Sequence, residues 1–407
     1  VENHETVTPG NPLKIVVQNR EGLLNSDEHL LITAFDGEFF LPIGKGKTEG
    51  QCTEITIERL PVPTVSGRSL HGSIIILFQK LIYKTLGTEF TYPLLRSVEV
   101  SQDKQRAVYE QDKEKIKSSV TSSEKILLYI HGIIGDTTSL VKSLQLAKFT
   151  ENGQEKTLRD KYNLVLAFDY ENLHTTIEDN AKFLKQRLEE IGLGANHGKQ
   201  LHIVAHSMGG LISRTFIEKE GGNQVVQHLV MLGTPNNGSP WPCIQDWAFM
   251  CLGIGLNQLS TIIWPANILA ALLAFLEVND NALEQMNPKH SFITDIATNP
   301  DPNVQYTIIA GDCSIKKQAY STELGKQSAI IRLSQKLFSS TTNNMLDTIC
   351  NLVFNEPNDI AVALDSIKSI NLNRNPQPRI ISPDAACDHL TYFSSQAGLD
   401  ALIKALI

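Results

Sequence analysis

One stretch of the chain, Leu201 to Gly210, holds a serine in a setting that would suit a nucleophile. The stretch runs from an apolar strand through a small-x-Ser-x-Gly turn into a helix. A serine hydroxyl is a poor nucleophile in water, so an enzyme must expose it, place a base beside it and supply donors for the oxyanion. A sharp strand-to-helix turn exposes Ser207 and aims the Met208 N–H at the developing charge. Ala205 and Gly209 leave room for this turn, although alanine replaces the more usual first glycine.

A second apolar run, Lys125 to Ile130, ends in His131-Gly132. Ligand sites in open parallel sheets lie beyond the carboxyl ends of the strands, and a glycine there lets the backbone turn tightly. We therefore expect the N–H groups of Ile133 and Met208 to form an oxyanion hole. His131 and Gly132 are expected at the substrate-binding site.

The candidate base is His389, because it is the one histidine that follows Asp359 in the sequence. The chain order is then Ser207, Asp359, His389, which is the order of α/β-hydrolases and differs from that of chymotrypsin or subtilisin. The histidine would take the serine proton, and the aspartate would fix its tautomer. His202 and His206 lie near the serine, but we interpret both as structural.

The acid has two further candidates. Asp312 follows an apparent strand at 306–310, so it is the alternative to Asp359. Asp388 adjoins His389 in sequence and would have to fold back on its neighbour, so we discount it. The sequence favours Asp359 and leaves Asp312 open.

These motifs together resemble the lipase and esterase branch of the α/β-hydrolase superfamily, and the chain is similar to bacterial lipases and to GPI-inositol-deacylase-like hydrolases. The resemblance covers about Ser123 to Ile407. The matching pieces are His131-Gly132-Ile133, the turn at Ser207, Leu232 to Ser239, Asp359 with Val362 and Ser366, and Asp388-His389-Leu390. The resemblance implies the fold and a Ser-His-Asp triad, and it implies no particular substrate.

The elements around these motifs predict an α/β fold. Apolar strand runs at 163–168, 226–232 and 305–310 add to the two already described, and an amphipathic helical stripe extends from Ile177 to Ile191. Strands that alternate with helices give a mostly parallel sheet with helices on both faces, as in the α/β-hydrolase fold. We assign this domain to residues 123–407.

The first part of the chain differs from the rest. Short strands are expected at 14–17, 30–34, 38–41 and 54–57, with turn signals between them, which predicts a small β-rich domain at residues 1–65. An apolar helix is expected at 74–86, and a charged helix or linker at 101–124. Residues 66–122 would thus connect the two domains.

Two insertions interrupt the predicted α/β domain. Residues 247–276 carry no charged side chain, and a single membrane span is rejected because it would separate Ser207 from His389. We expect a two-helix cap over the serine at 241–283, with Trp241 and Trp247 in contact with substrate. A buried helix pair without a gating role is the alternative. A second insertion at 313–358 would add to the cap.

Composition excludes some classes of function. The net charge is −8 and there is no basic block, which argues against a nucleic-acid partner. No metal-ligand spacing, phosphate loop or dinucleotide fingerprint is present, so we expect no metal and no cofactor. The six scattered cysteines favour a reduced, cytoplasmic protein, although Cys243 and Cys251 are close enough to pair if the protein is secreted. Because the chain begins at Val1, it is expected to be a processed form or part of a longer protein. The β-rich domain would then contact other parts of that longer protein.

The sequence thus predicts a serine hydrolase that cleaves carboxylic esters, and the apolar cap favours lipid-like esters. Transient contact of the cap with a lipid surface is expected. An amidase, thioesterase or peptidase would use the same triad. A protein of another class, an interaction module with a silent hydrolase fold, would also have these elements.

Overall fold

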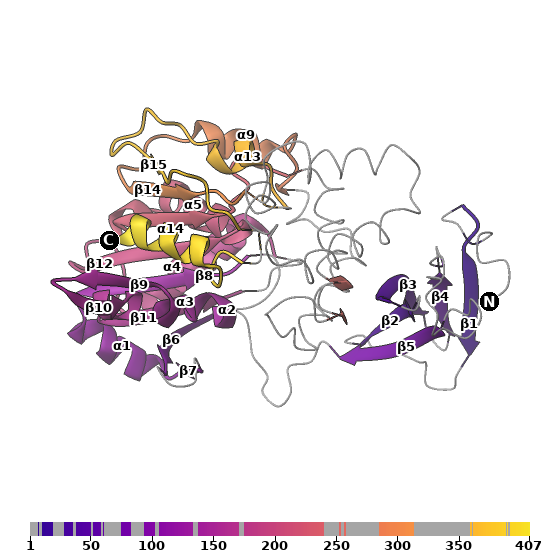
Figure 1. Cartoon of the computed structure of the whole chain (residues 1–407). Coiled ribbons are helices and arrows are strands. Elements are labelled where there is room, and N and C mark those ends of the chain that lie inside the picture. Colours follow the sequence, from indigo (N-terminus) through magenta and orange to yellow (C-terminus); the bar gives the residue numbers. More distant parts are fainter. Residues whose placement is uncertain are drawn as a thin grey trace. The chain divides into compact units, whose positions relative to one another are not determined.

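The structure of the chain is a computed structural model (Figure 1). It describes residues 7, 10–18, 28–35, 38–49, 52–57, 60, 75–82, 93–101, 106–132, 137–170, 175–239, 252–253, 256–257, 285–312, 359, 361–387, 389 and 391–407. The chain forms two compact units. The smaller unit comprises Val1–Glu89, Gln245–Val278 and Tyr320–Ile349, and the larger comprises Phe90–Ile244, Asn279–Ala319 and Cys350–Ile407.

The smaller unit contains a five-stranded antiparallel sheet with the order β1-β4-β3-β2-β5. The strands are β1 (Leu13–Gln18), β2 (Glu28–Phe35), β3 (Phe40–Glu49), β4 (Cys52–Ile57) and β5 (Ile75–Ile82). Ile55 and Ile57 are buried and Glu54 is exposed, as expected for a strand with one face in a core. The predicted β-rich region is therefore present.

The apolar run expected to form a helix at 74–86 is instead the strand β5. It pairs with β2 residue by residue, from Glu28 opposite Ile82 to Phe35 opposite Ile75. A short apolar run does not distinguish a buried strand from a helix, and here the tertiary pairing decides. The sheet therefore continues past the boundary expected at residue 65.

The larger unit contains an eight-stranded sheet with the order β15-β14-β13-β12-β8-β11-β6-β7. The strands are β6 (Leu94–Val100), β7 (Ala107–Glu110), β8 (Lys125–Ile130), β11 (Leu164–Asp169), β12 (Gln200–His206), β13 (His228–Leu232), β14 (Gln305–Ile309) and β15 (Arg379–Ile380). In this order every neighbouring pair between β15 and β11 is parallel. The strand β6 pairs antiparallel with both β11 and β7. This order confirms the predicted α/β-hydrolase fold. It also moves the start of the domain from 123 to about Leu94, because β6 and β7 belong to the sheet.

Helices lie on both faces of this sheet (Figure 1). They are α1 (Lys113–Ser122), α2 (Thr137–Val141), α3 (Ser143–Leu146), α4 (Ile177–Glu190), α5 (Met208–Lys219), α9 (Ser291–Thr298), α13 (Leu364–Lys368) and α14 (Gln396–Leu406), with short 3-10 turns η2 (Leu158–Lys161) and η3 (Gly222–Gln224) and the hairpin β9 (Lys148–Glu151) and β10 (Gln154–Thr157). Side chains of α2, α3 and α14 pack into one core with Leu127 and Tyr129 of β8. The alternate residues Ile126 and Leu128 are also fully buried, because α4 and α5 cover the other face.

Most of the two expected insertions lies outside the described residues, and so do Trp241 and Trp247. Four residues of the first insertion are described: Leu252, Gly253, Leu256 and Asn257. Asn257 contacts the sheet of the smaller unit, where its side chain accepts from the Phe40 N–H at 2.7 Å and donates to the Phe40 carbonyl at 2.8 Å. Among the helices that the structure describes, none has the length and apolar character that crossing a membrane requires.

Two histidines near the amino ends of β12 and β13, the half-buried His202 and the buried His228, predict an acid-sensitive stability. Burial lowers the pKa of His228 from 6.5 to about 4, and it also lowers the pKa of His202, whose ring lies 5.4 Å away. Between pH 6.5 and 4 the unfolded chain therefore binds protons that the folded chain does not. The stabilisation is complete above pH 6.5 and is lost as the pH falls.

We expect His228→Gln to reduce this pH dependence, because the amide can still bond to Thr307 and does not titrate. Between pH 7 and pH 5 the parent protein should lose roughly 2 kcal/mol more unfolding free energy than the variant. Urea denaturation at the two pH values measures the difference. Equal losses in both proteins would contradict the burial of a neutral His228.

Candidate active site

Ser207 lies at the sharp turn between β12 and α5. Its backbone has φ 52° and ψ −128°, a conformation that residues other than glycine rarely adopt. The Ser207 N–H donates to the Leu232 carbonyl at 2.9 Å, so the parallel ladder continues to the strained residue itself. Met208 begins α5, and the first N–H groups of a helix have no acceptor within it. The turn therefore has the geometry expected of a nucleophile elbow.

Gly132 lies against the serine. A Cβ built on Gly132 would fall 2.7 Å from the Ser207 Cβ, closer than two carbon atoms can approach. This contact explains why glycine follows β8 and shows that the end of that strand adjoins the elbow. Ile133, the other expected oxyanion donor, lies outside the described residues.

Asp359 and His389 form a buried pair. The His389 Nδ1 donates to the Asp359 Oδ2 at 2.7 Å, and the His389 N–H donates to the Asp359 carbonyl at 2.8 Å. Both side chains are almost completely inaccessible to solvent. The carboxylate of Asp359 accepts from the His389 ring, and the alternative acid, Asp312, is also buried. Asp388 lies outside the described residues.

The Asp359 carboxylate is held by further donors. Its Oδ1 accepts from the N–H groups of Ala361 at 3.2 Å and Val362 at 2.8 Å, and its Oδ2 accepts from the Tyr392 hydroxyl at 2.9 Å. Burial, with the adjacent Asp359, raises the pKa of Tyr392 well above 10, so the hydroxyl keeps its proton. Tyr392 in turn accepts from the Gly311 N–H at 2.7 Å. The buried charge is thus satisfied on both oxygens.

His206 connects the elbow to His389. Its Nε2 lies 2.8 Å from the His389 carbonyl, and the two ring centroids are 4.6 Å apart. Burial, together with the nearby His389, lowers the pKa of His206 well below 6.5, so the ring is neutral and donates to this carbonyl. The structural role expected for His206 therefore has a specific partner, the backbone of the candidate base.

The loop after β13 anchors the segment that carries Asp359, the candidate acid. The Asn236 side chain donates to the Ile367 carbonyl at 2.7 Å, and the Ser239 hydroxyl donates to the Ala361 carbonyl at 2.9 Å. In the same loop Gly233 has φ 59°, and a Cβ there would lie 2.7 Å from the Asp359 Oδ2. The motif from Leu232 to Ser239 therefore contacts both Asp359, the candidate acid, and the segment that follows it.

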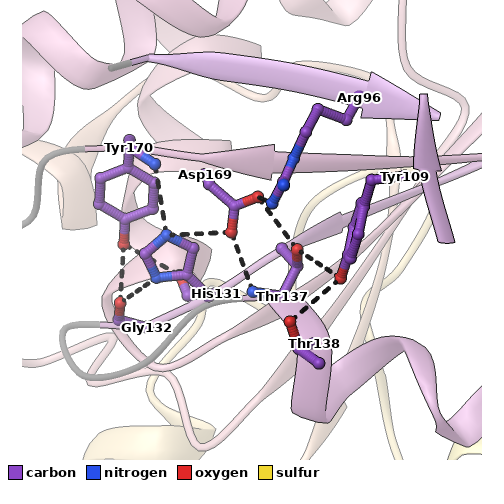
Figure 2. A network of polar contacts seen from close by, with 8 residues as sticks. All are labelled: Arg96, Tyr109, His131, Gly132, Thr137, Thr138, Asp169 and Tyr170. Atoms are coloured by element: carbon purple, nitrogen blue, oxygen red, sulfur yellow. Dashed lines mark hydrogen bonds and ion pairs between the residues drawn. The ribbon is translucent and has the colours of Figure 1, made fainter. Parts of the chain in front are cut away.

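His131, expected to bind substrate, has both ring nitrogens engaged inside the protein (Figure 2). Its Nδ1 lies 2.7 Å from the Gly132 carbonyl, and its Nε2 lies 3.3 Å from the Tyr170 N–H. The ring is buried and stacks on the Tyr170 ring at 4.3 Å. The described contacts give it a structural setting, although the residue does adjoin the site through Gly132.

Sequence reasoning did not identify Tyr170, Asp169 or Tyr392 as site residues. Asp169 ends the apolar strand β11 and Tyr170 follows it, where ligand-site residues of parallel sheets lie, so their position was a usable signal. Tyr392 lies three positions after His389, and no pattern marks that tyrosine as a partner of a residue 33 positions earlier.

The fold and the buried pair beside the elbow define a protein of the α/β-hydrolase class. The chain belongs to the family described as a domain of unknown function, DUF7379, whose model matches residues 95–407. A search of curated proteins by sequence gives no match.

Several solved structures are similar to this chain at low sequence identity. The lipase BlEst2 of Bacillus licheniformis in its mature form is 16% identical, with a TM-score of 0.42 over 70% of this chain and 92% of that one. EstA from Clostridium botulinum is 13% identical, with a TM-score of 0.37 over 70% and 88%. Phospholipase PlaB from Legionella pneumophila is 18% identical, with a TM-score of 0.34 over 60% and 45%.

We expect Tyr392→Phe to destabilise the protein by about 2–3 kcal/mol, because the buried Gly311 N–H loses its acceptor and Asp359 loses a donor. Urea denaturation at neutral pH measures the change. Tyr162→Phe is the matched control, since that hydroxyl makes one bond, to His202 at 3.0 Å, and its loss should cost about 1 kcal/mol. Equal losses of unfolding free energy in the two variants would contradict the prediction that the Tyr392 hydroxyl stabilises the protein more than a single ordinary hydrogen bond does.

Proposed function

We propose that this protein is a serine hydrolase that cleaves carboxylic esters. The observation that carries the proposal is the buried Asp359–His389 pair beside the strained Ser207 elbow. A hydrogen bond from Nδ1 to a carboxylate places the proton of the neutral imidazole on Nδ1. The Nε2 of His389 is then the basic nitrogen that a serine nucleophile requires.

In the proposed reaction the Ser207 Oγ attacks the acyl carbon while the His389 Nε2 takes its proton. The N–H groups of Ile133 and Met208 stabilise the oxyanion. Collapse of the tetrahedral intermediate breaks the ester bond, and His389 returns the proton to the leaving alcohol. Water then attacks the acyl-enzyme with His389 as base, which releases the acid and restores Ser207.

Ser207 is the proposed nucleophile, and its substitution tests this role. Ser207→Ala should abolish covalent labelling by a fluorophosphonate and lower the hydrolysis of a p-nitrophenyl ester by several orders of magnitude. Labelling followed by intact-mass measurement, together with the ester assay, tests it. Full labelling of the variant would assign the nucleophile to another residue, and an unlabelled parent protein would favour the silent interaction module.

The two acid candidates are separated by matched substitutions. Asp359→Asn should lower turnover by about 10⁴-fold, because the imidazole would take the wrong tautomer. Asp312→Asn should lower it far less, and both variants should retain the circular dichroism of the parent. The reverse ranking would make Asp312 the acid of the triad.

A lipid-like substrate is proposed from residues 247–276, which carry no charged side chain. Where an uncharged, mainly apolar stretch of this length is exposed, it commonly marks binding or membrane contact. We therefore expect kcat/KM to rise with acyl length in a series of p-nitrophenyl esters and to rise again with aggregated substrate. Replacement of 247–276 by a short Gly/Ser linker should leave kcat/KM for short-chain esters unchanged and reduce kcat/KM for long-chain esters.

The substrate preference of the intact protein, measured as kcat/KM across the same series, decides whether the substrate is lipid-like. A preference for short acyl groups, or turnover confined to an amide or a thioester, would overturn the lipid proposal and favour an esterase, amidase or thioesterase. Equal losses on short and long esters in a folded linker variant would mean that the segment is core packing. The proposed cap over Ser207 would then also fail.

A further inference from the structure

A buried charge cluster lies on the helix that begins at the serine elbow. Arg214 and Glu218 are one turn apart on α5, and the Arg214 Nε donates to the Glu218 Oε1 at 3.0 Å. Arg374 donates to the same oxygen at 2.8 Å, and its guanidinium lies over the Tyr306 ring. The three charged side chains are each at most 3% exposed. The cluster is therefore inside the protein, about two turns of helix from Ser207.

The cluster fixes the direction of one guanidinium. Burial raises the pKa of Glu218, but Arg214 and Arg374 outweigh this effect and keep the pKa below 4.5, so the carboxylate is ionised. Its Oε1 also accepts from the Tyr306 hydroxyl at 3.0 Å, and its Oε2 accepts from the Asn299 amide at 3.0 Å. A buried ion pair adds little stability, because both charges lose their hydration. It does hold the Arg214 guanidinium, a rigid fork of donors, in one orientation.

Two further nitrogens of Arg214 are aimed at other elements. Its Nη2 donates to the Ile296 carbonyl of α9 at 2.7 Å, and its Nη1 donates to the Asn236 side-chain oxygen at 3.0 Å. A guanidinium only donates, so the Asn236 amide must present its oxygen to Arg214 and has its nitrogen free for another partner. That nitrogen donates to the Ile367 carbonyl at 2.7 Å. Arg214 thus selects the orientation in which Asn236 can bond to the segment after Asp359.

The loop at residues 236–239 also reaches the acid itself. The Ser239 hydroxyl donates to the Ala361 carbonyl at 2.9 Å. The N–H of Ala361 in turn donates to the Asp359 Oδ1 at 3.2 Å. Each side chain along this path is buried, so water does not compete for the bonds. The described contacts therefore connect Arg214 to the candidate acid.

We infer that Arg214 is a positioning residue, which acts through Asn236 on the segment that carries Asp359. The inference rests on the proposed hydrolase function. It gives α5 two roles, since the helix begins at the proposed nucleophile and holds the acid segment two turns later. Both side chains act at a distance, so their loss should misplace Asp359 relative to His389. That change should lower kcat and leave KM unaltered.

The test uses the full chain and a p-nitrophenyl butyrate assay. Arg214→Met should lower kcat about tenfold, and Asn236→Leu should lower it by a similar factor, with KM within about twofold of the parent. The rate of labelling by a fluorophosphonate should fall by the same factors, because that reaction also requires the activated serine. A role in substrate binding would instead raise KM and leave kcat unchanged, which would overturn the inference.

The double variant, Arg214→Met with Asn236→Leu, shows whether the two residues act in one path. If Arg214 acts through Asn236, the double variant should keep kcat within about twofold of Asn236→Leu alone, because the second substitution removes a contact that is already lost. Independent effects would multiply to a loss of about 100-fold and would overturn the inference.

The matched control is Arg374→Met. Arg374 bonds to the same Glu218 oxygen as Arg214, and in the described part of the chain no bond joins it to Asn236. Its loss leaves Glu218 paired with Arg214. The thermal midpoint should therefore fall about as far as in Arg214→Met, while kcat stays within about twofold of the parent. A fall in kcat as large as in Arg214→Met would mean that the cluster acts through general stability, and it would overturn the inference.

A second variant, Asn236→Asp, carries the test if Arg214→Met does not fold. The aspartate keeps an acceptor for Arg214, and the added charge is tolerated because two guanidinium groups share one carboxylate in the cluster. It lacks the donor to the Ile367 carbonyl, so kcat should again fall about tenfold. The parent kcat in this variant would overturn the inference. Circular dichroism and thermal midpoints identify any variant that fails to fold.

Ser207→Ala separates this inference from the proposed function. If that variant leaves ester hydrolysis intact, the hydrolase proposal fails and this inference fails with it. If it abolishes hydrolysis while Arg214→Met and Asn236→Leu keep the parent kcat and labelling rate, the inference alone is overturned.

Discussion

The site depends on the burial of one charge, the carboxylate of Asp359. An ionised carboxylate away from water is costly unless every oxygen is hydrogen-bonded. Here two backbone N–H groups, a tyrosine hydroxyl and an imidazole N–H supply the bonds. Each donor fixes something else: the backbone groups close the turn after Asp359, Tyr392 reaches Gly311 after β14, and His389 takes one tautomer. The requirement to satisfy one buried charge therefore orients the candidate base.

The parallel sheet explains why residues far apart in the sequence meet. The carboxyl ends of β8, β12, β13 and β14 lie at one edge, because these strands are neighbours with the same direction. Gly132, Ser207, Gly233 and Gly311 each follow one of those strands within two residues. Glycine at 132 and 233 is needed because a Cβ would meet Ser207 or Asp359. The sheet brings these residues together, and glycine, which has no side chain, allows the backbone to approach Ser207 and Asp359 closely.

The central strands and the elbow were predictable from the sequence because each is encoded locally. A fully buried parallel strand is a continuous apolar run, and β8, β11, β12, β13 and β14 all fit that pattern. The strand β5 was assigned to a helix, since its pairing with β2 lies outside any local window. The chain order selected His389 as the base, while the sequence favoured Asp359 as the acid and left Asp312 open. The structure brings the Asp359 and His389 side chains into contact. The bond from Tyr392 to Asp359 and that from Tyr170 to the end of β8 depend on tertiary packing alone, so no spacing rule reveals them.

The elbow shows how the fold tolerates strain at the residue that the proposed reaction needs. A non-glycine residue at φ 52° costs on the order of 1–3 kcal/mol, and such a conformation persists only where its surroundings fix it. The ladder bond from the Ser207 N–H to Leu232 fixes one side of the turn, and the helix that starts at Met208 fixes the other. His206, immediately before the serine, bonds to the backbone of His389. The residue before the strained serine thus contacts the backbone of the candidate base, so β12 links the elbow to His389 through one side chain.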